Sequence, residues 1–178
     1  MTWYKDEIYL NTSDDQKEIN VWLSDKSKDK EILWIGIGNS SLAIECQDSI
    51  IDGVTICQDE VELAKKLFSD TYRYKPVLID KYSEDFKFDR KYDFIIDNNP
   101  ISFITSKEQG LQFLRKLKTL LKPDGMIVTH VKGVIWNQTK VIREQVDKNC
   151  NFTLTYCFEM FEEAGLTIKQ EGGVICLK

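Results

Sequence analysis

Short apolar runs of strand length alternate along the chain with longer stretches of helical periodicity. The runs lie at 32–35, 54–57, 77–79, 94–96 and 126–130. The first of them, Ile32–Ile35, is apolar at every position, which is typical of a strand covered by helices on both faces. The alternation therefore predicts an α/β fold with a largely parallel sheet.

The stretches between these runs predict the helices. Leu111, Leu114, Leu117 and Leu121 form an apolar stripe along the longest of them. Two short runs near the end of the chain, 166–169 and 174–177, flank Gly172–Gly173 and predict a closing antiparallel pair. The expected helices span 13–23, 41–46, 59–68, 107–121, 138–147 and 156–164.

The length and composition are those of a single globular domain. The chain has 178 residues, of which 42% are hydrophobic and 30% charged. The net charge of −5 does not favour binding to a nucleic-acid backbone. No apolar run approaches the ~20 residues that cross a bilayer, and the first residues lack the pattern of a signal peptide. We therefore expect a cytoplasmic protein without membrane association.

The cysteines and the histidine do not suggest a metal site. The five cysteines show no C-x-x-C spacing, and His130 is the only histidine. We expect reduced thiols and no bound metal.

A glycine-containing loop follows the first apolar run and is the first candidate ligand site. Gly36-Ile37-Gly38 stands where a parallel strand should end, which is where ligands bind in such sheets. Glycine lets the backbone turn sharply and lets a ligand approach without a Cβ, and the next helix would offer N–H groups to an anion. The loop is neither a dinucleotide fingerprint, because Ser41 replaces its third glycine, nor a P-loop.

Four segments together carry a resemblance to a known family. They are ILWIGIGNSSLA, the strand-end residue Asp80, the run KYDFIID and the turn LKPDGMIVTH. From Glu31 to Lys178 the chain resembles the class I S-adenosylmethionine-dependent methyltransferases, with residues 1–30 as an amino-terminal helical segment of one domain, 1–178. The resemblance implies a Rossmann-like, doubly wound, mostly parallel seven-stranded sheet with an antiparallel last strand.

The resemblance also implies a binding site for S-adenosylmethionine. Asp80 would meet the adenine amine. The family usually has an acid at the end of the second strand that holds both ribose hydroxyls, but Gln58 stands nearest that place and Asp59 follows it. Which of these two serves the ribose stays open. The remaining residues implied are Gly36, Ile37 and Gly38 under the methionine end, Asn39 and Ser40 at its carboxylate, and Lys81 and Tyr82 beside the adenine.

Three residues at the ends of the fourth and fifth strands are candidates for the catalytic site. Asp97 and Asn98 follow the fourth strand, where the family places substrate-facing residues, although an Asx turn would explain them equally well. His130 ends the fifth strand and could act as a base near neutral pH, or it could be a structural histidine. Trp136, like the amino-terminal Trp3, Tyr4 and Tyr9, could flank the site.

These observations favour a methyltransferase that acts on N or O of a small molecule or of an exposed protein segment. Methyl transfer depends mainly on in-line positioning, because the sulfonium is already activated. One alternative is an aminopropyltransferase of the spermidine-synthase type, which KYDFIIDNNP resembles, although its usual second acid is missing. Another is a non-catalytic binding module or partner subunit with the same fold, which the departure at Gln58 supports.

Overall fold

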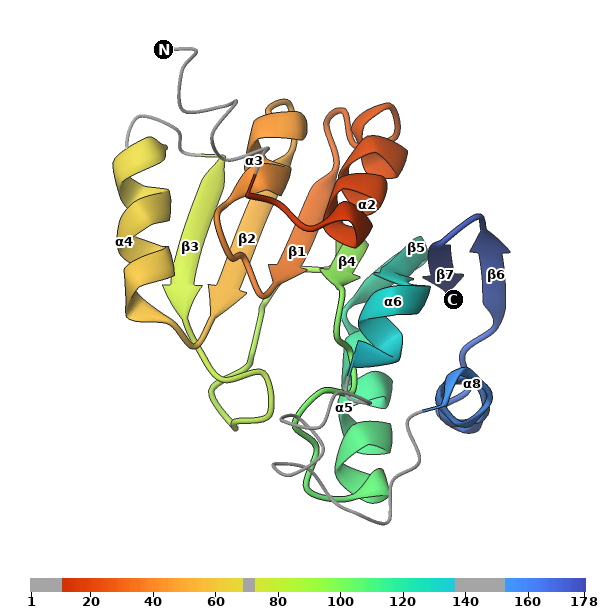
Figure 1. Ribbon diagram of the computed structural model, residues 1–178. Helices are drawn as coiled ribbons and strands as arrows, with labels where there is room; N and C mark the ends of the chain where they lie inside the picture. The colour runs from red at the N-terminus through yellow and green to blue at the C-terminus, as the bar shows by residue number, and fades with distance from the viewer. Residues whose placement is uncertain (1–10, 69–72, 137–152) are drawn as a thin grey trace.

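The computed structural model describes residues 11–68, 73–136 and 153–178 (Figure 1). The expected helix at 138–147 and the aromatic residues Trp3, Tyr4 and Tyr9 lie outside these residues. The strands are β1 (Glu31–Ile35), β2 (Ile50–Thr55), β3 (Tyr74–Leu78), β4 (Tyr92–Asp97), β5 (Leu121–His130), β6 (Ile168–Glu171) and β7 (Val174–Leu177). The helices are α2 (Asp14–Ser24), α3 (Ser41–Glu45), α4 (Gln58–Leu67), α5 (Lys107–Thr119), α6 (Val131–Val134) and α8 (Leu154–Glu163).

The strands form one seven-stranded sheet in the order β3-β2-β1-β4-β5-β7-β6. Strands β1 to β5 pair in parallel, and β7 runs antiparallel to both β5 and β6. The predicted Rossmann-like sheet is therefore confirmed, with β1 between β2 and β4 and with the closing antiparallel pair.

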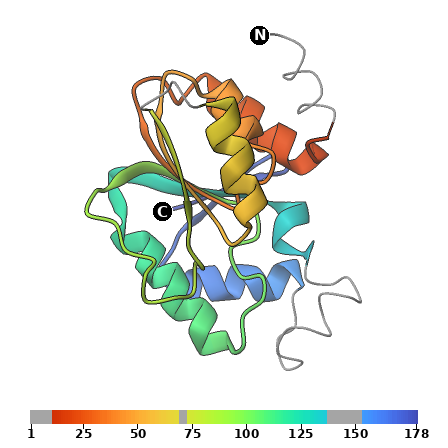
Figure 2. The same cartoon turned by 90° about the vertical axis from the view of Figure 1, so that its left-hand side faces the viewer.

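Helices cover both faces of the sheet, as the apolar first strand predicts (Figure 2). Along β1, Leu33 and Ile35 pack into the cluster that contains α5 and α8 residues. Ile32 and Trp34 pack into the opposite cluster, which contains residues of α2, α3 and α4. The strand period of two thus divides the core into two layers of side chains. None of the helices in the described ranges is long and apolar enough to span a membrane.

The second strand begins four residues earlier than predicted. It runs from Ile50 to Thr55, so that Asp52 and Gly53, which resemble a turn in the sequence, lie inside it. The Asp52 carboxylate accepts a hydrogen bond of 2.8 Å from the hydroxyl of Tyr92. A Cβ on Gly53 would lie 2.8 Å from side-chain atoms of both Ile37 and Tyr74. Close packing and a cross-strand partner therefore hold a turn-like dipeptide in an extended strand.

Two other predicted boundaries also shift. Strand β3 begins at Tyr74 and contains Pro76, which an edge strand tolerates because one side of it is unpaired. The Lys122–Gly125 turn lies within β5 as a register shift, because Tyr92 pairs with Leu121 and Phe94 pairs with Met126. The ends of β1, β2 and β4 lie side by side at the carboxyl edge of the sheet, because Ile35 pairs with both Val54 and Asp97.

Candidate functional site

A cavity of about 630 Å³ lies at the carboxyl ends of strands β1 to β4. The arrowheads of β1, β2 and β3 point to this edge of the sheet (Figure 1). The loops after all four strands line the cavity, together with Trp136 and the segment that enters α2. Its volume is within the range of about 300–1,000 Å³ that is usual for small-molecule sites, and its position is where doubly wound sheets bind ligands.

The loop after β1 borders the cavity at Gly36, Ile37 and Gly38. Gly36 and Gly38 have φ values of 77° and 49°, which favour glycine. No heavy atom lies within 4 Å of the position that a Cβ would occupy at either residue. Ile37 between them is fully buried and anchors the loop in the core. The two glycines therefore leave an open surface on which a ligand can approach the main chain.

Asn39 and Ser40, which follow this loop, have different environments. Asn39 borders the cavity, and its amide donates a hydrogen bond of 3.0 Å to the hydroxyl of Thr12. Ser40 is fully buried and lies 3.0 Å from the hydroxyl of Tyr74, away from the cavity lining. Burial raises the pKa of Tyr74, so its hydroxyl stays protonated. The structure brings Asn39, but not Ser40, to the cavity.

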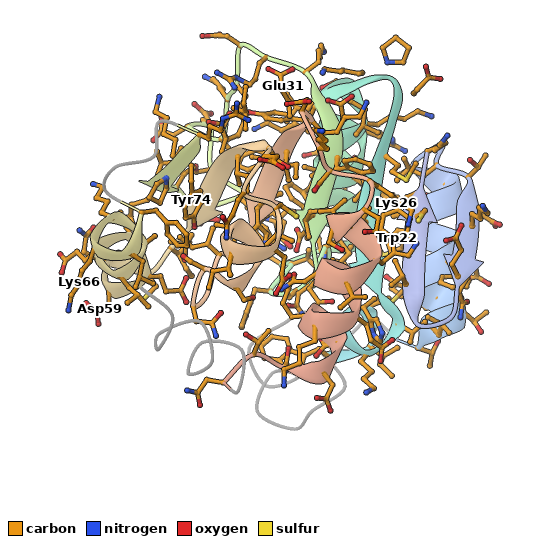
Figure 3. The ribbon with its side chains drawn as sticks, turned by 90° about the horizontal axis from the view of Figure 1, so that it is seen from above. Trp22, Lys26, Glu31, Asp59, Lys66 and Tyr74 are labelled. Carbon is orange, nitrogen blue, oxygen red and sulfur yellow. The ribbon has the colours of Figure 1, made fainter. Side chains whose placement is uncertain are left out.

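The two residues expected to serve the ribose lie outside the cavity lining. Gln58 and Asp59 are exposed in the first turn of α4, and Asp59 projects outward from that helix (Figure 3). The residues that end β2 at the cavity are Thr55 and Ile56. The Thr55 hydroxyl donates a hydrogen bond of 2.5 Å to Glu60, and Ile56 is 74% exposed. No carboxylate among the described lining residues therefore stands at the end of β2.

Asp80, Lys81 and Tyr82 all line the cavity at the end of β3. The carboxylate of Asp80 accepts a hydrogen bond of 2.9 Å from the backbone N–H of Tyr82. The Tyr82 hydroxyl donates to the carbonyl of Ser102 at 2.5 Å, which joins this loop to the loop after β4. Burial and the charges of Asp97 and Asp80 raise the pKa of Tyr82. The three residues lie together where the resemblance places the adenine.

Asp97 and Asn98 also border the cavity, where β4 ends. The Asp97 carboxylate is almost completely buried and forms an ion pair of 2.9 Å with Lys81. Its other oxygen accepts from the backbone N–H of Asn99 at 3.0 Å. The Asn98 amide donates to Asp15, and its side-chain oxygen is a buried atom without a hydrogen-bond partner among the residues described. The Asp97 carboxylate and the Asn98 amide nitrogen are thus held in place by their partners, which fixes the shape of this end of the cavity.

Asp15 contributes a carboxylate from α2 to this arrangement. Burial would raise the pKa of Asp15, but the hydrogen bonds from Asn98 and Ser13 outweigh it and lower the pKa below its usual value. Asp15 is therefore ionised at neutral pH and holds the Asn98 amide by a charge-assisted bond.

His130 does not line the cavity, although it ends β5 at the same edge of the sheet. Its Nδ1 accepts from the backbone N–H of Lys132 at 3.1 Å and caps α6. Because Nδ1 accepts, Nε2 carries the ring proton and donates to Glu18 of α2 at 2.9 Å. The ring is 1% exposed, and a Cβ on Gly173 would lie 2.1 Å from Nε2. These contacts are those of a structural histidine that joins α2, β5 and β7.

We predict that His130→Ala destabilises the fold by about 2–4 kcal/mol, because it empties a buried site and removes a helix cap. His130→Asn should lose less, because asparagine is a good capping residue. Urea unfolding of the two variants and of the wild type measures the loss. A variant of wild-type stability with an altered pH dependence of turnover would instead support a catalytic base.

Polar residues of α2 and its entry segment hold the edge of the sheet beside the cavity, and the sequence prediction missed them. Of the four that follow, Thr12 lines the cavity itself. Each of four side chains contacts a different residue at the carboxyl edge of the sheet. The signal in the sequence is Asn20, a polar residue beside Ile19 and Leu23 on the apolar face of the helix. The structure shows it fully buried. The pairs are Thr12 with Asn39, Asp15 with Asn98, Glu18 with His130, and Asn20 with Ser41.

The described ranges contain no group of three or more metal-binding side chains that could hold an ion. Cys46, Cys57, Cys157 and Cys176 are free thiols, and burial raises the pKa of Cys46 and Cys176 to about 11.

Comparisons with known proteins were made by sequence and by structure. No protein-family model matches the chain, and no curated protein matches it significantly. Solved structures do match. The N-methyltransferase NodS from Bradyrhizobium japonicum WM9 aligns with a TM-score of 0.64 at 12% identity, over 91% of this chain and 93% of that one.

Two longer proteins also match. The CcbJ methyltransferase from Streptomyces caelestis has a TM-score of 0.54 at 17% identity, over 70% of this chain. A mycolic acid cyclopropane synthase, determined in complex with SAH, has a TM-score of 0.65 at 14% identity, over 87% of this chain. The chain spans 54% and 61% of these two proteins, respectively. At these identities the likeness establishes the fold.

Proposed function

Since the chain has the fold of the class I S-adenosylmethionine-dependent methyltransferases, we propose that it transfers a methyl group from S-adenosylmethionine to N or O of a small molecule. The observation that carries the proposal is the glycine loop at the cavity. Gly36 and Gly38 leave open space exactly where side chains would otherwise stand, in a cavity between the ends of four parallel strands.

The residues around the cavity fit the cofactor at both of its ends. Gly36, Gly38 and Asn39 would hold the methionine portion, and Asp80 would accept from the adenine amine. The SAH in the structure of the cyclopropane synthase supports the same ligand class. When bound, the cofactor supplies a methyl group already activated by the sulfonium.

The chain's own contribution to the reaction is positioning. Asp97 and Asn98 border the cavity next to the glycine loop, and their polar atoms are engaged with Lys81, Asn99 and Asp15. Such a pre-formed wall can orient a nucleophile in line with the methyl group, and positioning supplies most of what this reaction needs.

The two alternative functions make different demands on the same site. An aminopropyltransferase needs carboxylates for its amine substrate. Among the described residues two carboxylates line the cavity, Asp80 and Asp97, and Asp97 is already paired with Lys81. A non-catalytic module is favoured by one observation, namely that the cavity has Thr55 and Ile56 at the end of β2 in place of an acid. The methyltransferase remains the proposal because the glycine loop and Asp80 fit the cofactor.

The test is a set of calorimetric titrations with S-adenosylmethionine, S-adenosylhomocysteine and decarboxylated S-adenosylmethionine. A methyltransferase should bind the first two more tightly than the third, because the decarboxylated form lacks the carboxylate that the loop would hold. Tighter binding of the decarboxylated form would favour the aminopropyltransferase. Binding of none of the three would leave the non-catalytic module.

We predict that Ile56→Asp strengthens cofactor binding about tenfold. Ile56 is 74% exposed at the cavity, so a carboxylate there is hydrated and costs no buried contact. It could accept from both ribose hydroxyls, and hydrogen bonds to a charged group are worth about 1.5–3 kcal/mol. Leu63→Asp, on the exposed surface of α4 outside the cavity, is the matched control. Equal affinities in the wild type and Ile56→Asp would show that the ribose lies elsewhere.

A further inference from the structure

Two exposed aromatic side chains stand at one end of the cavity. Phe103, from the segment between β4 and α5, is 42% exposed, and Trp136, just after α6, is 40% exposed. Both border the cavity, and their rings meet edge to face with centroids 5.8 Å apart. In the described part of the chain they are the aromatic residues that are exposed rather than buried or half-buried.

We propose that Phe103 and Trp136 form the binding surface for the methyl acceptor, and that the acceptor is a flat, uncharged aromatic molecule carrying a hydroxyl or amine. This inference rests on the proposed function, because it takes Asp80, at the end of β3, as the place of the adenine. The segment after β4 that carries Phe103 contacts the loop after β3, through the hydrogen bond from Tyr82 to Ser102 and the ion pair of Lys81 with Asp97, so the acceptor would lie beside the adenine.

The backbone at Phe103 holds its ring at the cavity. Phe103 has a φ of 59°, which is uncommon for a residue with a bulky side chain. The preceding residue is fixed on both sides, because the Ser102 hydroxyl donates to the carbonyl of Asn99 at 2.7 Å and the Ser102 carbonyl accepts from Tyr82. A strained conformation persists where its surroundings determine it, and here it keeps an apolar ring in contact with solvent at a ligand cavity.

The charges at this end of the cavity favour an uncharged ligand. The charged side chains among the described lining residues are Asp80, Lys81 and Asp97, and the last two pair with each other at 2.9 Å. The side-chain amide of Asn99 donates to the carbonyl of Gly133 at 3.0 Å. A phosphate or carboxylate would therefore find no unpaired cation among these residues, and the carboxylate among them without a cationic partner, Asp80, is the one that the proposed function assigns to the adenine amine.

An aromatic acceptor would contact both rings, in stacked or edge-to-face geometry. Such contacts stabilise a complex beyond the area that they bury, and each ring that is lost should weaken binding about tenfold. The pair would also exclude water from one side of the acceptor, next to the wall formed by Asp97 and Asn98.

The test uses 2-naphthol as probe, titrated by calorimetry into protein saturated with S-adenosylhomocysteine. Decahydro-2-naphthol has the same hydroxyl without the aromatic ring, and 2-naphthyl phosphate and tetramethylammonium supply the charged alternatives. Phe103→Gly removes a ring and suits the positive φ, and Trp136→Ala removes the other. Leu78→Ala is the matched control, since Leu78 is 50% exposed and lies outside the cavity lining.

The inference predicts that 2-naphthol binds at least tenfold tighter than each of the other three probes. Its affinity should fall about tenfold in Phe103→Gly and in Trp136→Ala, and stay unchanged in Leu78→Ala. Equal binding of the saturated probe, preference for a charged probe, or unchanged affinity in both ring variants would overturn it. So would much weaker binding of 2-naphthol to the saturated protein than to the cofactor-free protein, because the two ligands would then compete for one place in the cavity.

The two proposals fail separately. Absence of S-adenosylhomocysteine binding would contradict the proposed function, and the same probes and variants in the cofactor-free protein would then decide whether the aromatic surface binds a flat ring. Binding of S-adenosylhomocysteine without binding of 2-naphthol would contradict the aromatic acceptor alone.

Discussion

Replacing Gly38 with valine is expected to weaken binding of S-adenosylhomocysteine by roughly 100-fold, or about 2.7 kcal/mol. A Cβ at Gly38 meets no protein atom within 4 Å, so the valine side chain would occupy the open surface where the ligand approaches the main chain. The binding loss should therefore come from steric exclusion at the cavity. Calorimetric titration of the folded variant measures it.

Gly172→Val provides a control for the backbone strain that any such substitution introduces. Gly38 has a φ of 49° and Gly172 a φ of 63°, and neither has an atom within 4 Å of its Cβ position. Both valine variants should thus lose about 1–3 kcal/mol of stability to strain. Gly172 lies between β6 and β7, outside the cavity lining, so its variant should bind with wild-type affinity. Equal binding losses in the two variants would mean that strain, rather than occupation of the site, is responsible.

Replacing Lys81 with methionine is expected to lower the free energy of unfolding by about 3–5 kcal/mol. The Lys81 ammonium lies 2.9 Å from Asp97, whose side chain is only 3% exposed, and it also donates to the carbonyl of Asn99. The variant leaves a buried carboxylate without its counter-ion, which costs more than the ion pair itself contributes. Urea unfolding at neutral pH measures the change.

Adding Asp97→Asn to Lys81→Met separates the charge effect from lost packing. The double variant removes the unpaired carboxylate, so it should recover most of the lost stability and be clearly more stable than Lys81→Met alone. If the double variant were no more stable, the loss would come from the other contacts of the ammonium, which Met also lacks. These are the hydrogen bond to the carbonyl of Asn99 and the approach to 5.3 Å from the ring centroid of Tyr82 and 5.2 Å from that of Phe113.

The sequence predicts the order and type of the elements better than their limits. The runs of β1 and β4 contain consecutive apolar residues, which is typical of parallel strands buried on both faces, so both strands could be predicted from the sequence. The predicted start of β2 was wrong because Asp52 and Gly53 have turn propensity. Their extended conformation depends on Tyr92 and Tyr74, which are distant in the sequence. Such tertiary contacts override local propensity.

The alternation of side chains along β5 predicts the face of the sheet on which His130 lies. Along β5, Ile127 packs into the cluster with α5 and Val128 into the cluster with α2. Side chains two residues apart share a face of a strand, so His130 lies on the α2 face with Val128. Its contact with Glu18 follows from this alternation, whereas its position at the strand end alone suggested a place in the cavity.

No local pattern predicts the contact between Asp15 and Asn98 or the position of Ile56 at the cavity. Asp15 reaches Asn98 across 83 positions of the chain, and only the packing of α2 over the sheet brings them together. The position of Ile56 at the cavity depends on where β2 ends, which is two residues earlier than predicted, so Gln58 and Asp59 lie in α4 rather than at the cavity.

The proposed function requires that the cavity at the carboxyl ends of β1 to β4 bind S-adenosylmethionine through the glycine loop. A titration of ¹⁵N-labelled protein with S-adenosylhomocysteine, followed by amide chemical shifts, tests it most directly. The account predicts saturable shifts that are largest at Gly36, Gly38 and Asp80, with Gly172 unaffected. The absence of saturable shifts, or shifts that leave Gly36 and Gly38 unchanged while residues elsewhere respond, would contradict it.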